Sequence, residues 1–379
     1  MNYIKRLQEM AAAIETREPY NGYFYSVANI VTILVVGLLC GLRCAHEIYQ
    51  WSCSENVETV FLEYFNIRKM PCYAQFMNIL GNIKADSLDK IFIDWCKSIV
   101  ENRIKDKTIA IDGKTVRSTD AMDAFENPLH IVSAQIAEYG LTIGQVAVDD
   151  KSNEIPAVQA LIKMLCVEGA LVVADALNCQ KKTAQAVIDG KGDYLLAAKG
   201  NQPDLHSDIK LYFDTESGEL EKFEKHEKGH GRIETRTAWV SHDIDWYENR
   251  GKWPNLACFG AVRRVCLEKG NTSVETRYYI SSRKLTAEEL LKYSRNEWGV
   301  ESMHWILDVV FNEDRTLVIE KDAQRTLNTL RKTAINLIRM YRDKYCPKSS
   351  LVGIMRANLF EPSKIPVFFE QIGALFGIG

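Results

Sequence analysis

Three acidic residues stand where a carboxylate could take part in chemistry. Asp112 follows the apolar run at 108–111, Asp175 follows another at 170–174, and Glu301 lies in a tryptophan-containing segment at 295–305. A carboxylate that directly follows a buried strand is held at a sheet edge while its head group meets solvent. Converging carboxylates favour hard divalent cations, which prefer oxygen ligands. Paired cations of this kind drive in-line displacement at phosphorus.

The composition is that of an ordinary globular protein. Of the 379 residues, 46% are hydrophobic and 26% are charged, and the formal net charge is −3. A chain of this length can bury a full core and is expected to form two or three domains. Bulk charge does not indicate a nucleic-acid partner, so any basic surface must be local.

The cysteines and the apolar segments argue against several classes of protein. The ten cysteines include no CxxC pair, so zinc-ribbon and thioredoxin-type sites lack support. The chain does not begin with a secretory signal pattern, and we therefore expect reduced thiols in a cytoplasm. The apolar segment 26–42 is shorter than the ~20 residues that usually span a bilayer. We expect it to be a buried core helix, with no membrane partner.

The hydrophobic period changes along the chain. Residues 1–104 have apolar positions at helical spacing, which predicts helices. The pattern then predicts a strand at 108–112, a hairpin at 130–138 and 141–149, and alternating helices and strands at 156–165, 170–174, 180–188 and 194–198. This order predicts an α/β fold with an antiparallel edge, as in ribonuclease-H-like nucleotidyl transferases. Chemistry in such sheets gathers at strand ends.

A polar and then β-prone segment at about 205–280 interrupts this order. We expect it to be a β-rich insertion with strands at 235–240, 256–267 and 276–280. Helices are predicted at 286–298 and 301–311, separated or kinked at Gly299, and an amphipathic helix at 322–345. The expected organisation is a helical N-terminal domain (1–104), a catalytic domain with the insertion (105–345) and a weakly patterned C-terminal tail (346–379).

The flanks of the three acids resemble DDE transposases of bacterial insertion sequences, specifically the H-repeat-associated group. The matching stretches occur in order at 111–118, 130–134, 150–155, 175–181, 193–202, 229–236 and 303–314. The resemblance implies a ribonuclease-H-like (integrase-type) catalytic domain with Asp112, Asp175 and Glu301 as its triad. It further implies that these acids hold two Mg²⁺ ions, for which Mn²⁺ can substitute, during DNA strand cleavage and strand transfer.

We expect DNA contacts from residues that flank the acids or lie in matched stretches. They are Lys114, Arg117, Lys199, Asn201, Gln202, His230, Arg232, Arg236, Arg295, Trp298 and His304. Basic side chains can bind phosphates, but salt bridges to neighbouring acids and a solvated charged face are the open alternatives. Trp298 and Trp305 could stack on an extruded base, although we expect core packing for both. His304 could also support Glu301 from one helical turn away.

The long C-terminal helix carries a series of basic residues with two open interpretations. They could follow a DNA backbone or form the ordinary solvent face of the helix. The residues are Arg325, Arg331, Lys332, Arg339, Arg342 and Lys344.

The third acid has altered neighbours. The group usually has His-Trp where this chain has Glu297-Trp298, and Glu-Asn where it has Glu301-Ser302. On a continuous helix Glu297 and Glu301 would share a face and repel each other, unless Gly299 breaks the helix or a metal relieves the repulsion.

A Tyr-Arg-Glu-Lys signature surrounds this glutamate in some related transposases. Ser294, Glu297 and Asp308 occupy its other positions here. Arg295 could supply the missing charge, and Asp308 is a reserve ligand.

Residues 226–230 formally match the HExxH motif of zinc proteases. That motif requires a helix that places both histidines on one face, and Gly229 and Gly231 oppose a helix here. We do not expect a zinc site.

Three functions stay open at this stage. The first is a transposase that cuts and joins DNA at element ends. The second is a nuclease of the same fold that cuts without joining, and the third is a domesticated DNA-binding protein without catalysis. Retention of all three acids argues against the third. Double-stranded DNA is the expected partner, and pairing of two ends predicts at least a homodimer in the reacting complex. The N-terminal domain could bind DNA ends or dimerise.

Overall fold

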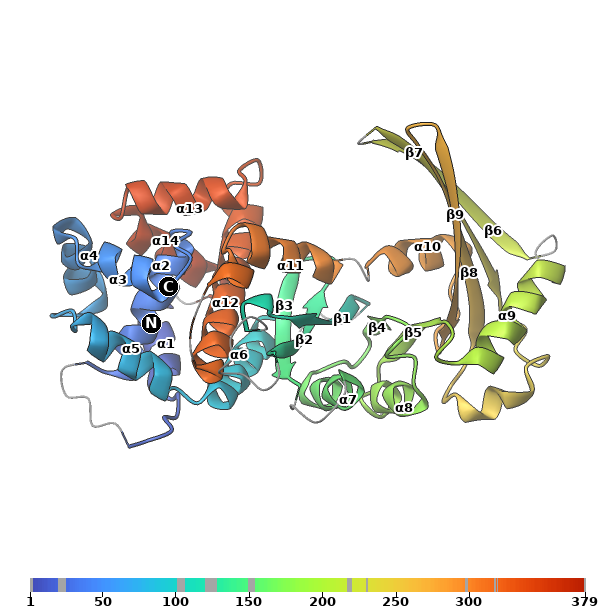
Figure 1. Ribbon diagram of the computed structural model, residues 1–379, viewed down its shortest axis with the longest axis horizontal. Helices are drawn as coiled ribbons and strands as arrows, with labels where there is room; N and C mark the ends of the chain where they lie inside the picture. Colours follow the sequence, from blue (N-terminus) through green and yellow to red (C-terminus); the bar gives the residue numbers. More distant parts are fainter. Residues whose placement is uncertain are drawn as a thin grey trace.

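The computed structural model describes residues 3–19, 25–100, 106–119, 128–148, 154–216, 220–229, 231–296, 299–316, 318 and 320–377. Along its long axis lie a bundle of helices, a sheet flanked by helices, and an extension of long antiparallel strands (Figure 1). The last helices of the chain return to the first ones, so both termini lie within the helical bundle.

The N-terminal region is helical, as its apolar spacing predicted. Its helices are α1 (Tyr3–Ala12), α2 (Val27–Leu39), α3 (Ala45–Ser52), α4 (Glu55–Phe65), α5 (Tyr73–Asn82) and α6 (Ala85–Val100). The segment expected to be a core helix forms α2, which is buried along nearly its whole length from Ile30 onward. The Ser26 side chain caps this helix by accepting a hydrogen bond from the backbone N–H of Asn29. No described helix is long and apolar enough to cross a membrane.

The sheet has the strand order β3-β2-β1-β4-β5-β9-β8-β7-β6 within the described residues. Its first half is made of β1 (Thr108–Thr115), β2 (His130–Ile136), β3 (Leu141–Ala147), β4 (Leu171–Ala174) and β5 (Asp193–Ala198). β1 pairs in parallel with β4, and β4 with β5, whereas β2 and β3 form the antiparallel hairpin at the edge. This order confirms the predicted ribonuclease-H-like fold with an antiparallel edge.

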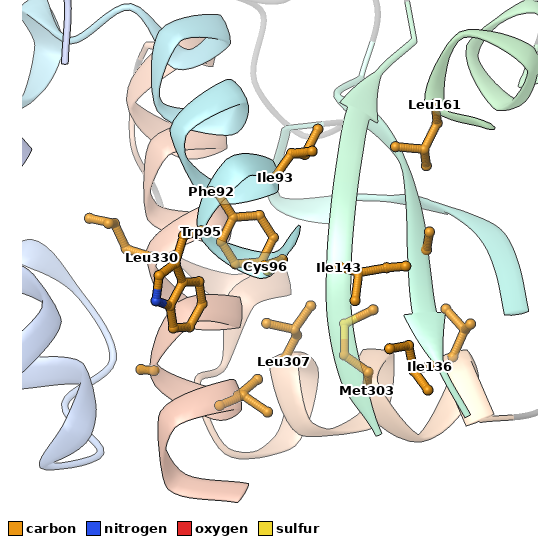
Figure 2. Packing of buried hydrophobic residues seen from close by; sticks show 14 of the residues in the cluster. Phe92, Ile93, Trp95, Cys96, Ile136, Ile143, Leu161, Met303, Leu307 and Leu330 are labelled. Carbon is orange, nitrogen blue, oxygen red and sulfur yellow. The ribbon is translucent and has the colours of Figure 1, made fainter. Parts of the chain in front are cut away.

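Helices cover both faces of this half of the sheet. α7 (Glu154–Met164) lies between β3 and β4 in the chain, α8 (Lys181–Asp189) lies between β4 and β5, and both helices lie on one face. α11 (Gly299–Val309) and α12 (Lys321–Tyr345) lie on the other face, where Lys332 of α12 donates hydrogen bonds to Ser133 of β2 and Gln145 of β3. Side chains of α6, α11 and α12 pack with those of β2 and β3 in the core (Figure 2).

The β-rich insertion continues the same sheet. Its four long strands are β6 (Glu221–Gly229), β7 (Arg232–Ser241), β8 (Cys258–Glu268) and β9 (Asn271–Ser281), and β9 pairs antiparallel with β5. Two elements of this region were not predicted individually, namely α9 (Pro203–Glu216) and the polar strand β6. α10 (Ala287–Asn296) packs against β6, β7 and β8 and leads back toward the first half of the sheet.

The residues expected to be a weakly patterned tail form two more helices. They are α13 (Leu351–Phe360) and α14 (Lys364–Leu375), and both pack against α12. α13 also contacts α2, and α14 contacts α1. The end of the chain therefore completes the core of the helical bundle.

Candidate active site

The sheet register brings two of the predicted acids to neighbouring strand positions. Ile111 of β1 pairs with Ala174 of β4, so Asp112 and Asp175 occupy the next position on two adjacent parallel strands. Glu301 lies in the first turn of α11, which packs against β1 and β2. Its helix begins at Gly299, and the preceding described helix, α10, ends at Asn296; the predicted break near Gly299 stays a prediction, because residues 297–298 lie outside the described residues. Glu297 lies outside the described residues.

Electrostatic coupling connects these acids. Burial raises the pKa of Asp112 to about 6, and the negative charges of Glu154, Asp175 and Glu301 raise it as well. A hydrogen bond from the backbone N–H of Gly113 acts in the opposite direction. At neutral pH the site therefore carries several carboxylates that repel one another.

The donor set fits a hard divalent cation in its chemistry, since it consists of carboxylate oxygens with excess negative charge. The side chains are not arranged as a closed ligand shell: within the described residues, no group of three or more His, Cys, Asp or Glu side chains could together hold a metal ion as they stand. Asp112, Asp175 and Glu301 are thus near one another without converging on one point.

A fourth carboxylate, Glu154, belongs to the site and was not predicted. It lies in the first turn of α7 and accepts hydrogen bonds from Asn178, at 2.7 Å, and from His130, at 3.1 Å. Burial alone would raise the pKa of Glu154, but these two partners outweigh it and lower the pKa. The matched stretch at 150–155 contained this residue, and that was the only sequence signal for it.

His304 lies beside the first acid. Its Nδ1 is 3.6 Å from Oδ2 of Asp112. Burial, together with the positive charges of Lys332 and Lys114, lowers the pKa of His304 to about 3, so the ring is neutral at physiological pH. His304 was expected to support Glu301, and the structure places its ring beside Asp112 instead.

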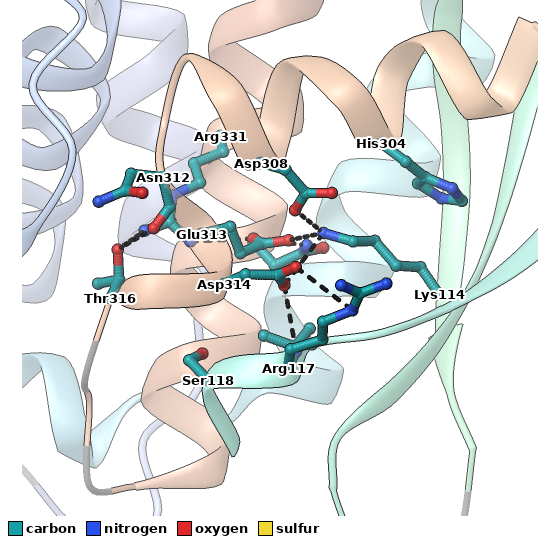
Figure 3. A network of polar contacts seen from close by, with 12 residues as sticks. Lys114, Arg117, Ser118, His304, Asp308, Asn312, Glu313, Asp314, Thr316 and Arg331 are labelled. Atoms are coloured by element: carbon teal, nitrogen blue, oxygen red, sulfur yellow. Dashed lines mark hydrogen bonds and ion pairs between the residues drawn. The ribbon is translucent and has the colours of Figure 1, made fainter. Parts of the chain in front are cut away.

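Lys114 is held by acids, as the salt-bridge alternative anticipated. Its Nζ pairs with Asp308, lies 3.1 Å from Oε2 of Glu313 and lies 3.6 Å from Oδ1 of Asp314 (Figure 3). Burial alone would lower the pKa of Lys114, but the three carboxylates raise it. Asp308, expected as a reserve ligand, is committed to this ion pair. The network joins β1 to α11 and to the turn that follows it.

The other predicted contact residues near the acids are more exposed. Arg117 is largely exposed and lies 3.8 Å from Asp314. Lys199 follows β5 and is exposed. Asn201 donates a hydrogen bond to the backbone of Ala176, and Gln202 donates one to the backbone of Cys179 at 3.1 Å. These two amides therefore brace the loop that follows Asp175.

A second basic region lies on the insertion. A hollow of about 500 Å³ is bordered by β6–β9 and α10, and its lining includes Arg232, Arg236, Arg264, Arg277 and Arg295. Carboxylates accompany these arginines: Glu234 pairs with Arg232, Arg236 and Arg264, and Glu227 pairs with Arg236 and Arg295. The predicted residues Arg232, Arg236 and Arg295 thus belong to one surface, which we call the arginine hollow.

Two predicted DNA contacts, His230 and Trp298, lie outside the described residues. The first part of the HExxH match does lie within them. His226 is on strand β6 and contacts Thr235 and Glu224. This stretch is therefore a strand up to Gly229, which supports the expectation that it is not a helical zinc motif.

The expectation of core packing for Trp305 is wrong. Trp305 is 60% exposed, and Val309, one turn further along α11, is 52% exposed. Both follow Glu301 at spacings of four residues, so an apolar surface extends along the helix from the third acid. The helix has a buried face made by Val300, Met303 and Leu307, and Trp305 does not belong to it.

Both interpretations of the basic residues on the C-terminal helix are wrong for three of them. Arg331, Lys332 and Arg339 are buried. Arg331 pairs with Glu313 at 2.9 Å, and burial lowers the pKa of Lys332 to about 7. Their partners are far away in the sequence, so amphipathic periodicity alone could not identify these positions as buried.

Comparison with known proteins establishes the family. A family model described as "Transposase DDE domain" matches residues 103–337. A second model, described as "DDE_Tnp_1-associated", matches residues 8–96. The chain therefore belongs to the family of transposases with a DDE domain, which confirms the resemblance noted in the sequence.

Relatives from Escherichia coli agree with this assignment. The chain is 36% identical over 276 residues to "Putative transposase YncI" of strain O157:H7, covering 70% of each chain. It is 34% identical over 345 residues to "Putative protein YbfL" of strain K12, covering 88% of this chain and 90% of the relative. It is also 34% identical over 278 residues to "H repeat-associated putative transposase YhhI" of strain K12, covering 71% and 73%.

Among solved structures, the fold is similar to a chain of the piggyBac transposase synaptic complex with hairpin DNA. The TM-score is 0.49 at 11% identity, and the match covers 97% of this chain and 78% of that one.

Proposed function

We propose that this protein is a DDE transposase that cleaves DNA strands at the ends of an insertion sequence and joins them to a target. The observation that carries the proposal is the sheet register, which places Asp112 and Asp175 at neighbouring positions, with Glu301 in the first turn of the helix that packs against β1. Three carboxylates, one within β1, one directly after β4 and one on α11, form the donor set that a metal-dependent phosphoryl transfer requires. The family assignment supports the same chemistry.

In this proposal Asp112, Asp175 and Glu301 hold two Mg²⁺ ions, with Mn²⁺ able to replace them. Bound cations would activate the attacking oxygen and stabilise the leaving oxygen at phosphorus. Asp112 sits at a rigid strand position, and the neutral ring of His304 limits its movement. Lys114, held by three acids, fixes the strand next to Asp112 relative to the helix of Glu301.

DNA would contact two surfaces. The arginine hollow supplies guanidinium groups at a spacing set by the strands, and guanidinium binds phosphate through paired hydrogen bonds. Glu227 and Glu234 neutralise part of this charge in the free protein, so phosphates would compete with them. The second surface is near Glu301, where the exposed indole of Trp305 is available to stack on a base.

Joining two element ends to one target requires two copies of the active site, so we further propose a homodimer in the reacting complex. The helical N-terminal region, which is built around α2, is proposed to bind DNA ends or to form the dimer contact.

The deciding experiment uses a duplex that carries an element end, taken from the inverted repeats that flank the coding region. We expect strand cleavage that depends on Mg²⁺, followed by transfer of the 3′ end to a second duplex. Asp112→Ala and Asp175→Ala should abolish both steps. Cutting by either variant would show that the proposed site is wrong.

The same assay separates the alternatives. Cutting without joining would favour a nuclease of this fold. DNA binding without cutting by the wild-type protein would favour a domesticated DNA-binding protein.

A further inference from the structure

Asn178 connects two carboxylates of the site. It is fully buried in the loop after β4. Its Nδ2 donates to Oε1 of Glu154 at 2.7 Å and to Oδ1 of Asp175 at 2.9 Å. Its backbone N–H also donates to Oδ1 of Asp175, at 3.2 Å. One amide group therefore fixes the relative position of the two carboxylates.

Glu154 is itself anchored on the other side. Its Oε2 lies 3.1 Å from Nε2 of His130, and Nδ1 of that ring lies 2.9 Å from Oγ1 of Thr115. Thr115 is the last residue of β1, and His130 is the first residue of β2. The contacts thus run from the end of the strand that carries Asp112, through His130 and Glu154, to Asn178 and Asp175.

Gly113 makes room for this arrangement. A Cβ atom at Gly113 would collide with the carboxylate of Glu154 and with the ring of His130. The residue directly after Asp112 therefore has to be a glycine for Glu154 to approach the strand end this closely. A side chain here would push Glu154 away from Asn178.

We propose that Glu154 and Asn178 form a positioning pair that orients Asp175 for cation binding. This inference rests on the proposed function. Both hydrogen bonds from Asn178 go to Oδ1 of Asp175. Among the described contacts, Oδ2 of Asp175 accepts no hydrogen bond from Asn178, so Oδ2 is the oxygen that can bind a cation. A ligating carboxylate held in this way loses less freedom on binding a metal, and removal of such partners typically weakens metal affinity about 10–100-fold.

The test measures Mn²⁺ binding to the whole chain without DNA. Electron paramagnetic resonance monitors the concentration of free Mn²⁺. Asn178→Ala and Glu154→Ala should each weaken binding about 10-fold or more. Glu154→Gln keeps an acceptor oxygen for Asn178, so its affinity should stay within about threefold of wild type. The control is Gln185→Ala, which removes an exposed hydrogen bond to Asp189 on α8 and should leave binding unchanged.

Thermal unfolding of each variant identifies any that fail to fold, and the Glu154→Gln and Glu154→Ala pair still decides the question if Asn178→Ala is unstable. Equal affinity of wild type, Asn178→Ala and Glu154→Ala would overturn the inference. Equal weakening by Glu154→Gln and Glu154→Ala would also overturn it, because charge rather than position would then be the cause. No Mn²⁺ binding by wild type would instead overturn the proposed metal site itself, and with it this inference.

A second readout concerns the cleavage reaction. A positioning role predicts that Asn178→Ala needs a higher Mg²⁺ concentration for half-maximal cleavage and approaches the wild-type rate at saturation. A lower rate at all Mg²⁺ concentrations, with an unchanged midpoint, would contradict the proposed role.

Discussion

Nδ1 of His304 lies 3.6 Å from Oδ2 of Asp112, so the helix that carries the third acid touches the strand that carries the first. The ring is neutral at physiological pH, because burial and two nearby lysines lower its pKa to about 3. The contact is therefore between a dipole and a carboxylate and is not a full ion pair. The contact orients β1, which carries Asp112, relative to α11, which carries Glu301.

His304→Ala should lower the rate of DNA cleavage about 10-fold, since loss of a group that orients a metal ligand has effects of this size. His304→Asn should retain more activity, because its amide keeps a polar group close to the position of Nδ1. Single-turnover cleavage at saturating Mg²⁺ measures the difference. His226→Ala, which changes an exposed ring on β6, is the matched control. Equal rates for His304→Ala and wild type would contradict the orienting role.

Asp112→Asn should stabilise the metal-free protein at pH 7–8 while abolishing cleavage. The pKa of Asp112 is raised to about 6 in the folded state, against an ordinary value of 3.8. The folded state therefore holds its proton more tightly, and the stability that this supplies is present below about pH 4 and is lost as pH rises through 6. Removing the charge relieves the cost of burying a carboxylate, which is the main cause of the raised pKa, and the smaller repulsion by neighbouring acids, and we expect a melting temperature a few degrees higher.

Thermal unfolding at two pH values, with and without Mg²⁺, checks this prediction. The advantage of Asp112→Asn should shrink toward zero near pH 4, where the wild-type carboxyl is protonated. Mg²⁺ should raise the melting temperature of wild type more than that of the variant, because a ligand that binds only the folded state stabilises it. A variant that melts below wild type at pH 8 would show that the buried, charged Asp112 carboxylate does not destabilise the metal-free protein.

The sequence was sufficient to predict the first half of the sheet and the places of Asp112 and Asp175 in it. The buried parts of the parallel strands β1, β4 and β5 are short apolar runs, a pattern that burial on both faces produces. A polar residue follows each apolar run, so Asp112, within β1, and Asp175, directly after β4, could be located without coordinates. Glu301 could not be located from the strand pattern, because it lies on a helix. It was recognised through its flanking residues.

The fourth acid could not be predicted from periodicity. Glu154 begins a helix, where an acidic residue is ordinarily explained by the helix dipole. Its role depends on hydrogen bonds to His130 and Asn178, each 24 residues away in the sequence. β6 was missed for a related reason: its side chains are mostly exposed, so it lacks the apolar alternation by which a strand is usually recognised.

The buried basic residues of α12 could not be predicted from the sequence pattern either. Lys and Arg are almost never fully buried unless they are paired, so a solvent face was the reasonable expectation. Arg331 is nevertheless buried, because Glu313 lies 2.9 Å away and Asn328 provides a second partner for that carboxylate. Only the tertiary structure brings such a pair together.

Glu313→Ala should destabilise the protein by about 3–5 kcal/mol, because it leaves the buried Arg331 without its counter-charge. Burial alone would raise the pKa of Glu313, but Arg331 and Lys114 outweigh it and lower the pKa to about 2. The double variant Glu313→Leu with Arg331→Met should recover much of the loss, because an apolar pair needs no compensation. Urea unfolding gives the free energies.

Asp343→Ala is the control for this experiment, since Asp343 pairs with Arg342 on the exposed end of the same helix and should contribute less than about 1 kcal/mol. If Glu313→Ala costs no more than Asp343→Ala, the buried pair is not what stabilises the junction between α12 and the turn after α11.

Trp305→Ala should weaken binding to an element end that has an unpaired base, without lowering the melting temperature. The indole is 60% exposed and lies one helical turn from Glu301, so its removal leaves no cavity in the core. Stacking on one base contributes about 1–3 kcal/mol, which corresponds to a loss of affinity of roughly 5–150-fold. Phe360→Ala, which removes a 77% exposed ring on α13, is the matched control. Fluorescence anisotropy with end duplexes that do and do not contain an unpaired base measures both variants. A loss of the same size on fully paired DNA would argue against stacking, because a paired and stacked base offers the indole no free face.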